Sequence, residues 1–311
     1  MNYFHLLFAK LILALLVTCT TNVTAASDQA RPLRVVASFS ILADITRNIG
    51  GDVVDVVALV GPDADAHVFE PSPADARRLA QADLVIVNGL HFEGWLARLI
   101  AASGYRGPIV VATTNVSVRR GRGVPDPHAW QDLRNGHIYV ENIRAALVKA
   151  RPAHAASLNE RADAYGAKLV ALDQAIRARF AEVPASGRRV ITLHDAFGYF
   201  GAAYGVEFLA PQGWSTDSEA SAANVAQLIR QMRQQRVRAV FLENISNPRL
   251  MLRLVREGGG VIGGTLYSDA LSSPGTAADT YIRMFEHNTA TIIKAIAPSA
   301  ASAPRATAGA P

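Results

Sequence analysis

Residues 189–200, RVITLHDAFGYF, place His194 directly after a short run that is rich in β-branched residues. A nearly continuous apolar run of this kind is typical of a strand that is buried on both faces of a parallel sheet. Proteins with such sheets bind their ligands in the crevice at the carboxyl ends of the strands. The stretch therefore predicts an α/β fold in which His194 points into a ligand-binding crevice.

The same pattern recurs in both halves of the chain. Each half has four apolar runs that can form strands, at residues 33–37, 53–60, 84–87 and 109–112 and at residues 190–193, 206–209, 239–242 and 261–266. Helices are expected between them, at residues 222–234 and 248–257 and after Ser72, which is followed by a proline at the first helical position and an acid in the first turn. This alternation predicts two small lobes, each built around a mainly parallel, four-stranded sheet.

A long amphipathic helix is expected between the two halves. Ser157-Leu158-Asn159-Glu160 has the pattern of a capping box, and apolar residues follow at spacings of three or four as far as Phe180. Pro184 and Gly187 would end this helix. We interpret it as one rigid connector, unlike the flexible strands that join the lobes of hinged binding proteins. The expected organisation is a signal peptide (1–26), an N-terminal lobe (27–150), the connecting helix (151–186), a C-terminal lobe (187–296) and a disordered tail (297–311).

The N-terminus has the features of a secretory signal. Lys10 precedes an apolar run over residues 11–17, and small residues follow as far as Ala26. The run is too short to span a bilayer as a permanent anchor. Cys19, the only cysteine, lies within this segment, but Thr18 before it is a poor fit to a lipoprotein cleavage site. We therefore expect ordinary cleavage and a periplasmic protein without disulfides, rather than a lipid anchor at Cys19.

Charge and composition narrow the classes of function. The net charge is only +5, and the basic residues are scattered apart from Arg119-Arg120-Gly121-Arg122. A nucleic-acid binder usually has a denser basic face with interleaved aromatic residues. No nucleic-acid partner is therefore expected, and we interpret the short basic cluster as a solvated loop tip. The tail is almost entirely Ala, Pro, Ser, Thr and Gly, a composition that cannot build a core.

Three other residues are placed like His194. His67 lies in GPDADAHVFEP (residues 61–71), His128 in DPHAW (126–130) and Asp269 in LYSDA (266–270), each after an apolar run or in a stiff turn. Three imidazoles and one carboxylate form the ligand set of a borderline-soft divalent metal. Because two of these residues come from each half, we expect the ion to lie in the cleft between the lobes.

Other polar residues near the predicted strand ends are secondary candidates. His91 is a reserve ligand, for which we favour a role in shaping the cleft. Glu243 ends a predicted strand, and it could either orient a ligating imidazole or be a plain strand-end acid. Trp130 could shield the ion from water. The remaining histidines of the mature chain are expected at the surface: His137, His154 and His287.

These motifs resemble the cluster A-I substrate-binding proteins of zinc and manganese ABC transporters, the zinc-uptake and metal-adhesin lipoprotein family. The resemblance runs from about Leu33 to Lys294 and is carried by residues 61–73, 88–95, 126–130, 193–199 and 241–243. It implies a lobe–helix–lobe fold, a periplasmic or surface location, and delivery of the ion to a membrane permease driven by a cytoplasmic ATPase. It also implies the same four metal ligands, His67, His128, His194 and Asp269.

Two departures from the family bear on the identity of the metal. Zinc-specific members often have a long loop rich in histidine and acids before the second histidine, whereas residues 115–124 are short, basic and free of histidine. Manganese-specific members often have glutamate at the third ligand position, where this chain has His194. Three imidazoles favour Zn²⁺, because Mn²⁺ prefers oxygen donors. Asp269 would still admit Mn²⁺ or Fe²⁺.

The favoured function is capture and delivery of the ion by a monomeric protein that is not an enzyme. Two alternatives remain: a secreted zinc-dependent hydrolase and a metal-binding surface adhesin. A catalytic zinc usually keeps one position open for water, and Asp269 would fill that position, so Glu243 could act as a general base only if Asp269 were not bound. No aromatic patch or repeat supports an adhesin.

Overall fold

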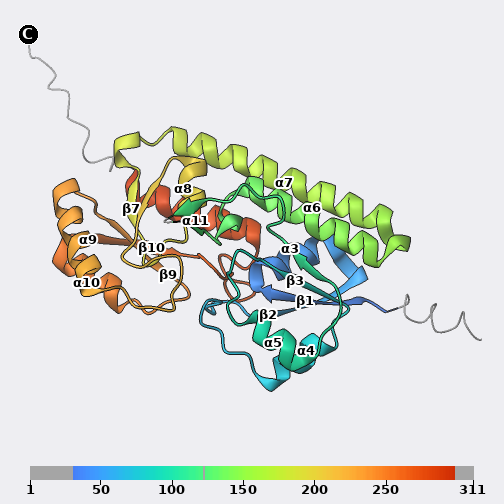
Figure 1. Cartoon of the computed structure of the whole chain (residues 1–311). Coiled ribbons are helices and arrows are strands. Elements are labelled where there is room, and N and C mark those ends of the chain that lie inside the picture. The colour runs from blue at the N-terminus through green and yellow to red at the C-terminus, as the bar shows by residue number, and fades with distance from the viewer. Residues whose placement is uncertain (1–30, 122, 298–311) are drawn as a thin grey trace, which may run out of the picture.

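The computed structural model describes residues 31–121 and 123–297, which form two α/β lobes joined by one long helix (Figure 1). The expected signal peptide, including Cys19, lies outside the described residues, and so does the expected tail beyond residue 297. Within the described ranges, no helix has the length and apolarity needed to cross a membrane.

The N-terminal lobe contains a parallel four-stranded sheet in the order β2-β1-β3-β4. Its strands are β1 (Leu33–Phe39), β2 (Val54–Val60), β3 (Leu84–Val87) and β4 (Ile109–Val111). Its helices are α3 (Ser40–Gly50), the short 3-10 helix η1 (Gly51–Val53), α4 (Pro73–Ala80) and α5 (Leu96–Ser103). Helix α4 begins as predicted, because the Ser72 hydroxyl accepts from the Asp75 N–H while the Asp75 carboxylate accepts from the Ser72 N–H.

The C-terminal lobe contains a second parallel four-stranded sheet, in the order β10-β9-β7-β8. Its strands are β7 (Arg189–Ile191), β8 (Glu207–Leu209), β9 (Ala239–Glu243) and β10 (Val261–Leu266). Its helices are α8 (Gly198–Tyr204), α9 (Ala222–Gln235), α10 (Arg249–Gly258) and α11 (Tyr281–Ile296). The predicted fold of two lobes with parallel sheets is therefore confirmed.

Strand β7 ends two residues earlier than the apolar pattern predicts. The N–H groups of Leu193 and His194 donate to the carboxylate of Glu243, at 2.7 and 3.0 Å, instead of continuing a strand ladder. A side chain from the neighbouring strand thus ends β7 and turns the chain, which places His194 in the loop beyond the sheet edge.

The connecting helix α7 (Ala155–Ala181) spans both lobes (Figure 1). The predicted capping box at Ser157 is wrong: the helix begins earlier, directly after the 3-10 helix η3 (Pro152–His154), and the Ser157 hydroxyl donates to the His154 carbonyl. Proline fixes a helical φ and has no N–H to leave unpaired, so the turn can start at Pro152. The apolar spacing is confirmed, since the following residues of α7 are buried: Leu158, Ala162, Tyr165, Leu169, Ile176 and Phe180.

Helix α6 (Leu133–Ala150) packs along the part of α7 that covers the N-terminal lobe (Figure 1). One continuous apolar core runs from the first sheet through α6 and α7 into α8 and α11, and it includes Ile45, Tyr139 and Phe285. A smaller cluster, including Leu228 and Met251, fills the outer part of the C-terminal lobe. The lobes thus share a core, which opposes a wide hinge motion. The exact boundaries of the expected lobes, at residues 150 and 187, stay a prediction.

The part of the basic cluster that the structure describes, residues 119–121, does not form a simple loop tip. It leads into a small hairpin, β5 (Arg120–Gly121) with β6 (Val124–Pro125), that reaches the other lobe. The Arg119 N–H donates to the Tyr199 hydroxyl at 2.9 Å, and the Arg119 guanidinium lies over the Tyr199 ring and donates to the Gly198 carbonyl. The solvated-tip interpretation is therefore wrong for Arg119, which joins the two lobes.

Candidate metal centre

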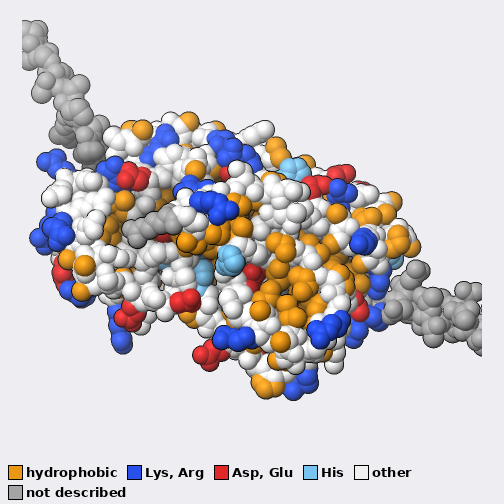
Figure 2. Space-filling view, viewed as in Figure 1, with side chains coloured by type: hydrophobic (Ala, Val, Ile, Leu, Met, Phe, Trp, Pro, Cys, Tyr) orange, Lys and Arg blue, Asp and Glu red, His pale blue; other side chains and the backbone are white. Residues whose placement is uncertain are grey.

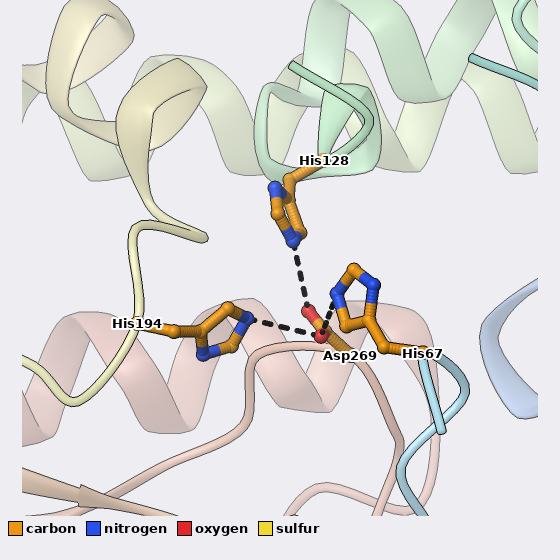
Figure 3. A group of neighbouring side chains, drawn as sticks. All are labelled: His67, His128, His194 and Asp269. Atoms are coloured by element: carbon orange, nitrogen blue, oxygen red, sulfur yellow. Dashed lines mark hydrogen bonds and ion pairs between the residues drawn. The ribbon is translucent and has the colours of Figure 1, made fainter. Parts of the chain in front are cut away.

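Four side chains from four separate loops meet between the lobes (Figure 3). His67 lies in the loop after β2, His194 in the loop after β7 and Asp269 in the loop after β10, so three of them follow the carboxyl ends of parallel strands. His128 directly precedes the 3-10 helix η2 (Ala129–Gln131). The structure brings together all four residues that the sequence singles out as metal-ligand candidates.

Asp269 lies at the centre of the group, and the three imidazoles point toward it (Figure 3). Its Oδ2 is 3.1 Å from Nε2 of both His67 and His194, and its Oδ1 is 3.7 Å from Nε2 of His128. One ligand atom from each residue lies within 4.8 Å of those of the other three. Metal bonds of about 2.1 Å in a tetrahedral shell separate the ligand atoms by about 3.4 Å. The measured spacings are those of a group that can hold one small cation.

The group is closed off from solvent. The side chains of His128, His194 and Asp269 have no exposed surface, and that of His67 retains 4 %. Among the described residues, neither Nε2 of His128 nor Oδ1 of Asp269 has a hydrogen-bond partner. Buried polar atoms without partners are costly. A divalent cation would satisfy both atoms at once.

Glu243 holds His194 from the side opposite Asp269. Its Oε2 lies 2.6 Å from Nδ1 of His194, which directs Nε2 toward the centre of the group. Burial opposes a charge on the imidazole, but the carboxylates of Glu243 and Asp269 raise the pKa of His194 well above its ordinary value. Of the two roles considered for Glu243, the geometry matches that of a carboxylate that orients a ligating imidazole.

Asp126 has the corresponding place beside His128, and the sequence reasoning missed it. Its Oδ1 lies 2.9 Å from Nδ1 of His128 and also accepts the His128 N–H at 3.0 Å. The carboxylate fixes both the backbone and the ring, so that Nε2 of His128 faces Asp269. Its position two residues before a candidate ligand, across a stiffening proline, is the only signal in the sequence that could have indicated this role.

The charge of Asp269 depends on the histidines around it. Burial by itself would raise the pKa of this carboxyl, but the rings of His194 and His128 hold it well below its ordinary value. Without a metal, the site combines an ionised carboxylate with an imidazole that readily holds a proton. A bound cation would take the place of that proton.

Aromatic rings of the N-terminal lobe line one side of the metal centre. Trp130 is fully buried with its ring centroid 5.3 Å from that of His128, so it can exclude water as the sequence suggests. Its indole N–H donates to the carbonyl of Ser268 at 2.9 Å, and the Gln131 amide donates to the same carbonyl at 2.7 Å. These bonds fix the loop that carries Asp269.

The loop that carries His67 is also tied to the other lobe. The carboxylate of Asp63 accepts from the Asn244 side chain at 3.0 Å and from the N–H and hydroxyl of Ser273, both at 3.1 Å. The Asp63 N–H donates to the Leu271 carbonyl at 2.9 Å. These contacts connect the His67 loop to the chain beside Glu243 and beside Asp269.

The other histidines lie outside the group of four. His91 is exposed, on a turn near His67. His137 and His154 are exposed as expected, whereas His287 is half-buried with its Nε2 3.0 Å from the Thr265 carbonyl.

Two α/β lobes with a buried three-histidine, one-aspartate group between them define a two-lobed metal-binding protein. The chain belongs to the family described as zinc-uptake complex component A, periplasmic, whose sequence model matches residues 35–295. It is therefore a substrate-binding protein of a metal ABC transporter.

Curated relatives have names that refer to different metals. The chain is 36 % identical over 288 residues to the manganese-binding lipoprotein MntA of Bacillus subtilis, covering 89 % of this chain and 94 % of the relative. It is 34 % identical to the zinc-binding protein TroA of Treponema pallidum (88 % and 91 % covered) and 34 % identical to the iron-binding protein YfeA of Yersinia pestis (86 % and 88 %). None of these three relatives is described as a hydrolase or an adhesin.

Solved structures show the same fold. The periplasmic zinc-binding protein TroA from Treponema pallidum superposes with a TM-score of 0.83 at 32 % identity, covering 86 % of this chain and all of that chain. The manganese-bound periplasmic metal-binding protein from Candidatus Liberibacter asiaticus gives a TM-score of 0.77 at 29 % identity, covering 85 % and 99 %.

Proposed function

We propose that this protein captures a divalent cation with His67, His128, His194 and Asp269 and delivers it to the membrane permease of its ABC transporter, without catalysing a reaction. The observation that carries this proposal is the convergence of four buried ligand atoms from four loops within 4.8 Å. Four protein ligands complete a tetrahedral shell and leave no position for a reactive water, which suits capture rather than catalysis.

Zinc is the ion that this ligand set favours. Three imidazole nitrogens and one carboxylate oxygen suit Zn²⁺, whereas Mn²⁺ prefers a larger share of oxygen donors. The names of the relatives refer to zinc, manganese and iron. The family thus admits all three ions, and in this chain the histidine at position 194 supports zinc.

The cation is captured outside the cytoplasm, by a monomer. The signal-like sequence before residue 27 supports secretion to the periplasm. The relative MntA is named as a lipoprotein, and the structural neighbour TroA is named as a periplasmic protein. The two lobes share one core and enclose the site within a single chain, so no second subunit is needed to complete it.

Isothermal titration with Zn²⁺ tests the proposal. His67→Ala and His194→Ala should each weaken zinc affinity more than about 100-fold, because the loss of a partner that only orients a ligand already costs 10–100-fold. His154→Ala, which alters an exposed histidine on the connector, should bind as the wild type does. Zinc should bind more tightly than Mn²⁺ or Fe²⁺ under the same conditions. Undiminished zinc affinity in both ligand variants would contradict the proposal.

A further inference from the structure

A pocket of about 150 Å³ opens beside the metal centre, next to His67. Of the four candidate ligands only His67 lines it, and His67 is also the one whose side chain keeps some exposure. Most of the wall is apolar or backbone, and its polar side chains are those of His67, His91, Ser215 and Asp217. Histidine side chains reach the surface near the junction of the lobes (Figure 2). The pocket therefore reaches the exposed part of the His67 side chain from solvent, while Nε2 of His67 stays buried.

The turn that carries His91 has an unusual backbone. Gly89, Leu90 and His91 have φ angles of 87°, 54° and 64°, so three successive residues adopt positive values. Side chains other than glycine are strained in this conformation, and such strain gathers at functional sites. The buried carboxylate of Glu93 fixes the turn by accepting the N–H groups of Asn88 at 2.6 Å and Gly89 at 3.1 Å. The fold thus holds His91 at the rim of the pocket.

Asp217 reaches the same pocket from the C-terminal lobe. His91 and Asp217 are both exposed, and within the described part of the chain neither the imidazole nor the carboxylate has a hydrogen-bond or ionic partner. An imidazole and a carboxylate are both ligands for divalent cations. Each lobe therefore places one unpartnered metal-binding side chain at the mouth of the pocket: His91 from the N-terminal lobe and Asp217 from the C-terminal lobe.

The segment around Asp217 is fixed relative to His67. The Thr216 hydroxyl donates to Oδ2 of Asp65 at 2.7 Å, and Oδ1 of Asp65 accepts the His67 N–H at 2.9 Å. Trp214 packs so closely on Gly121 that a Cβ there would lie 2.8 Å from the indole ring. The loop that bears Asp217 is thus joined to both the His67 loop and the hairpin, which keeps Asp217 at the mouth.

We propose that His91 and Asp217 form an outer capture site, which binds the entering cation and passes it to His67. This inference rests on the proposed function and adds to it the route by which the ion enters and leaves. The pocket is large enough to hold more than one water, so a partly hydrated ion can occupy it. Because the outer site is not part of the final ligand shell, it should speed binding and release alike and leave the equilibrium affinity nearly unchanged.

Stopped-flow mixing with Zn²⁺, followed with a chromophoric zinc chelator as competitor, measures both rate constants. The variants are His91→Asn, Asp217→Asn and the double variant, and asparagine is chosen at position 91 because it tolerates positive φ. In the double variant, we expect association and dissociation each to slow at least about 5-fold, since charged clefts raise on-rates by 10-fold or more. The dissociation constant for zinc should stay within about 2-fold of the wild type.

Two matched controls isolate the effect. Glu219→Gln removes an exposed carboxylate from the same segment, and His154→Asn removes an exposed imidazole from the connector; both should bind and release zinc at wild-type rates. Wild-type rates in the double variant would overturn the proposal. So would weaker affinity at an unchanged association rate, because it would place the two residues in the final shell. Failure of the wild type to bind zinc would instead contradict the proposed function.

Discussion

Glu243 has the largest effect among the groups that raise the pKa of His194. A proton held on this imidazole stabilises the metal-free protein below the ordinary pKa of histidine, and this stabilisation is lost as the pH rises through the raised pKa. The same proton competes with a cation for Nε2 of His194. Zinc affinity should therefore fall as the pH drops through the pKa of His194.

Glu243→Gln should change this pH dependence in a defined direction. Without the carboxylate, the pKa of His194 falls, so the decline in zinc affinity should begin at a lower pH than in the wild type. At pH values above both pKa values, the variant should bind zinc about 10–100-fold more weakly, because the imidazole is less firmly oriented. Titrations at a series of pH values measure both effects, with Glu219→Gln as control. A decline at the wild-type pH would show that Glu243 does not control the charge of His194.

The sequence revealed the candidate ligands but only part of their support. His67, His194 and Asp269 each follow an apolar run, and that local signal was enough to place them at strand ends. The supporting contacts join residues far apart in the chain: Asp63 and Asn244 are 181 residues apart, and Glu243 lies 49 residues after His194. The Asp63–Asn244 pair depends on how the lobes pack, and the Glu243–His194 pair depends on which strands are neighbours in one sheet; no local pattern specifies the partner in either case.

At the scale of elements, α7 should make a large contribution to stability. Leu169 is fully buried on the face of α7 that meets the core, whereas its neighbour Val170 is 44 % exposed. Leu169→Ala should lower the free energy of unfolding by about 2–5 kcal/mol through lost burial and a cavity. Val170→Ala should lower it by less than about 1 kcal/mol. Urea denaturation followed by fluorescence and circular dichroism measures both, and equal effects at the two positions would contradict the assigned face of the helix.

Helices were predictable where their signals are local. Ser72 caps α4 as the sequence indicates, since its partner Asp75 is only three residues away. Helix α6 was not predicted, and it contains Gly136, which disfavours a helix. In the structure, a Cβ on Gly136 would lie 2.6 Å from the Tyr281 hydroxyl, so this glycine permits close packing of α6 on α11. That requirement comes from tertiary structure and is invisible in the sequence.

At the scale of the whole molecule, the site is built from contacts between the lobes. The shared core, the hydrogen bonds of Asp63 and those of Arg119 all join the two halves around the four candidate ligands. We therefore expect the ion to be released through movement of single loops rather than through a wide opening of the lobes. A wide opening of the lobes would break the core along α6 and α7.

Anomalous diffraction at the zinc absorption edge, from crystals of the zinc-loaded protein, tests the central claim most directly. We expect one strong peak between the lobes, about 2.0–2.2 Å from Nε2 of His67, His128 and His194 and from a carboxylate oxygen of Asp269. A peak elsewhere on the molecule, or a cation that leaves any of these four side chains out of contact, would contradict the account.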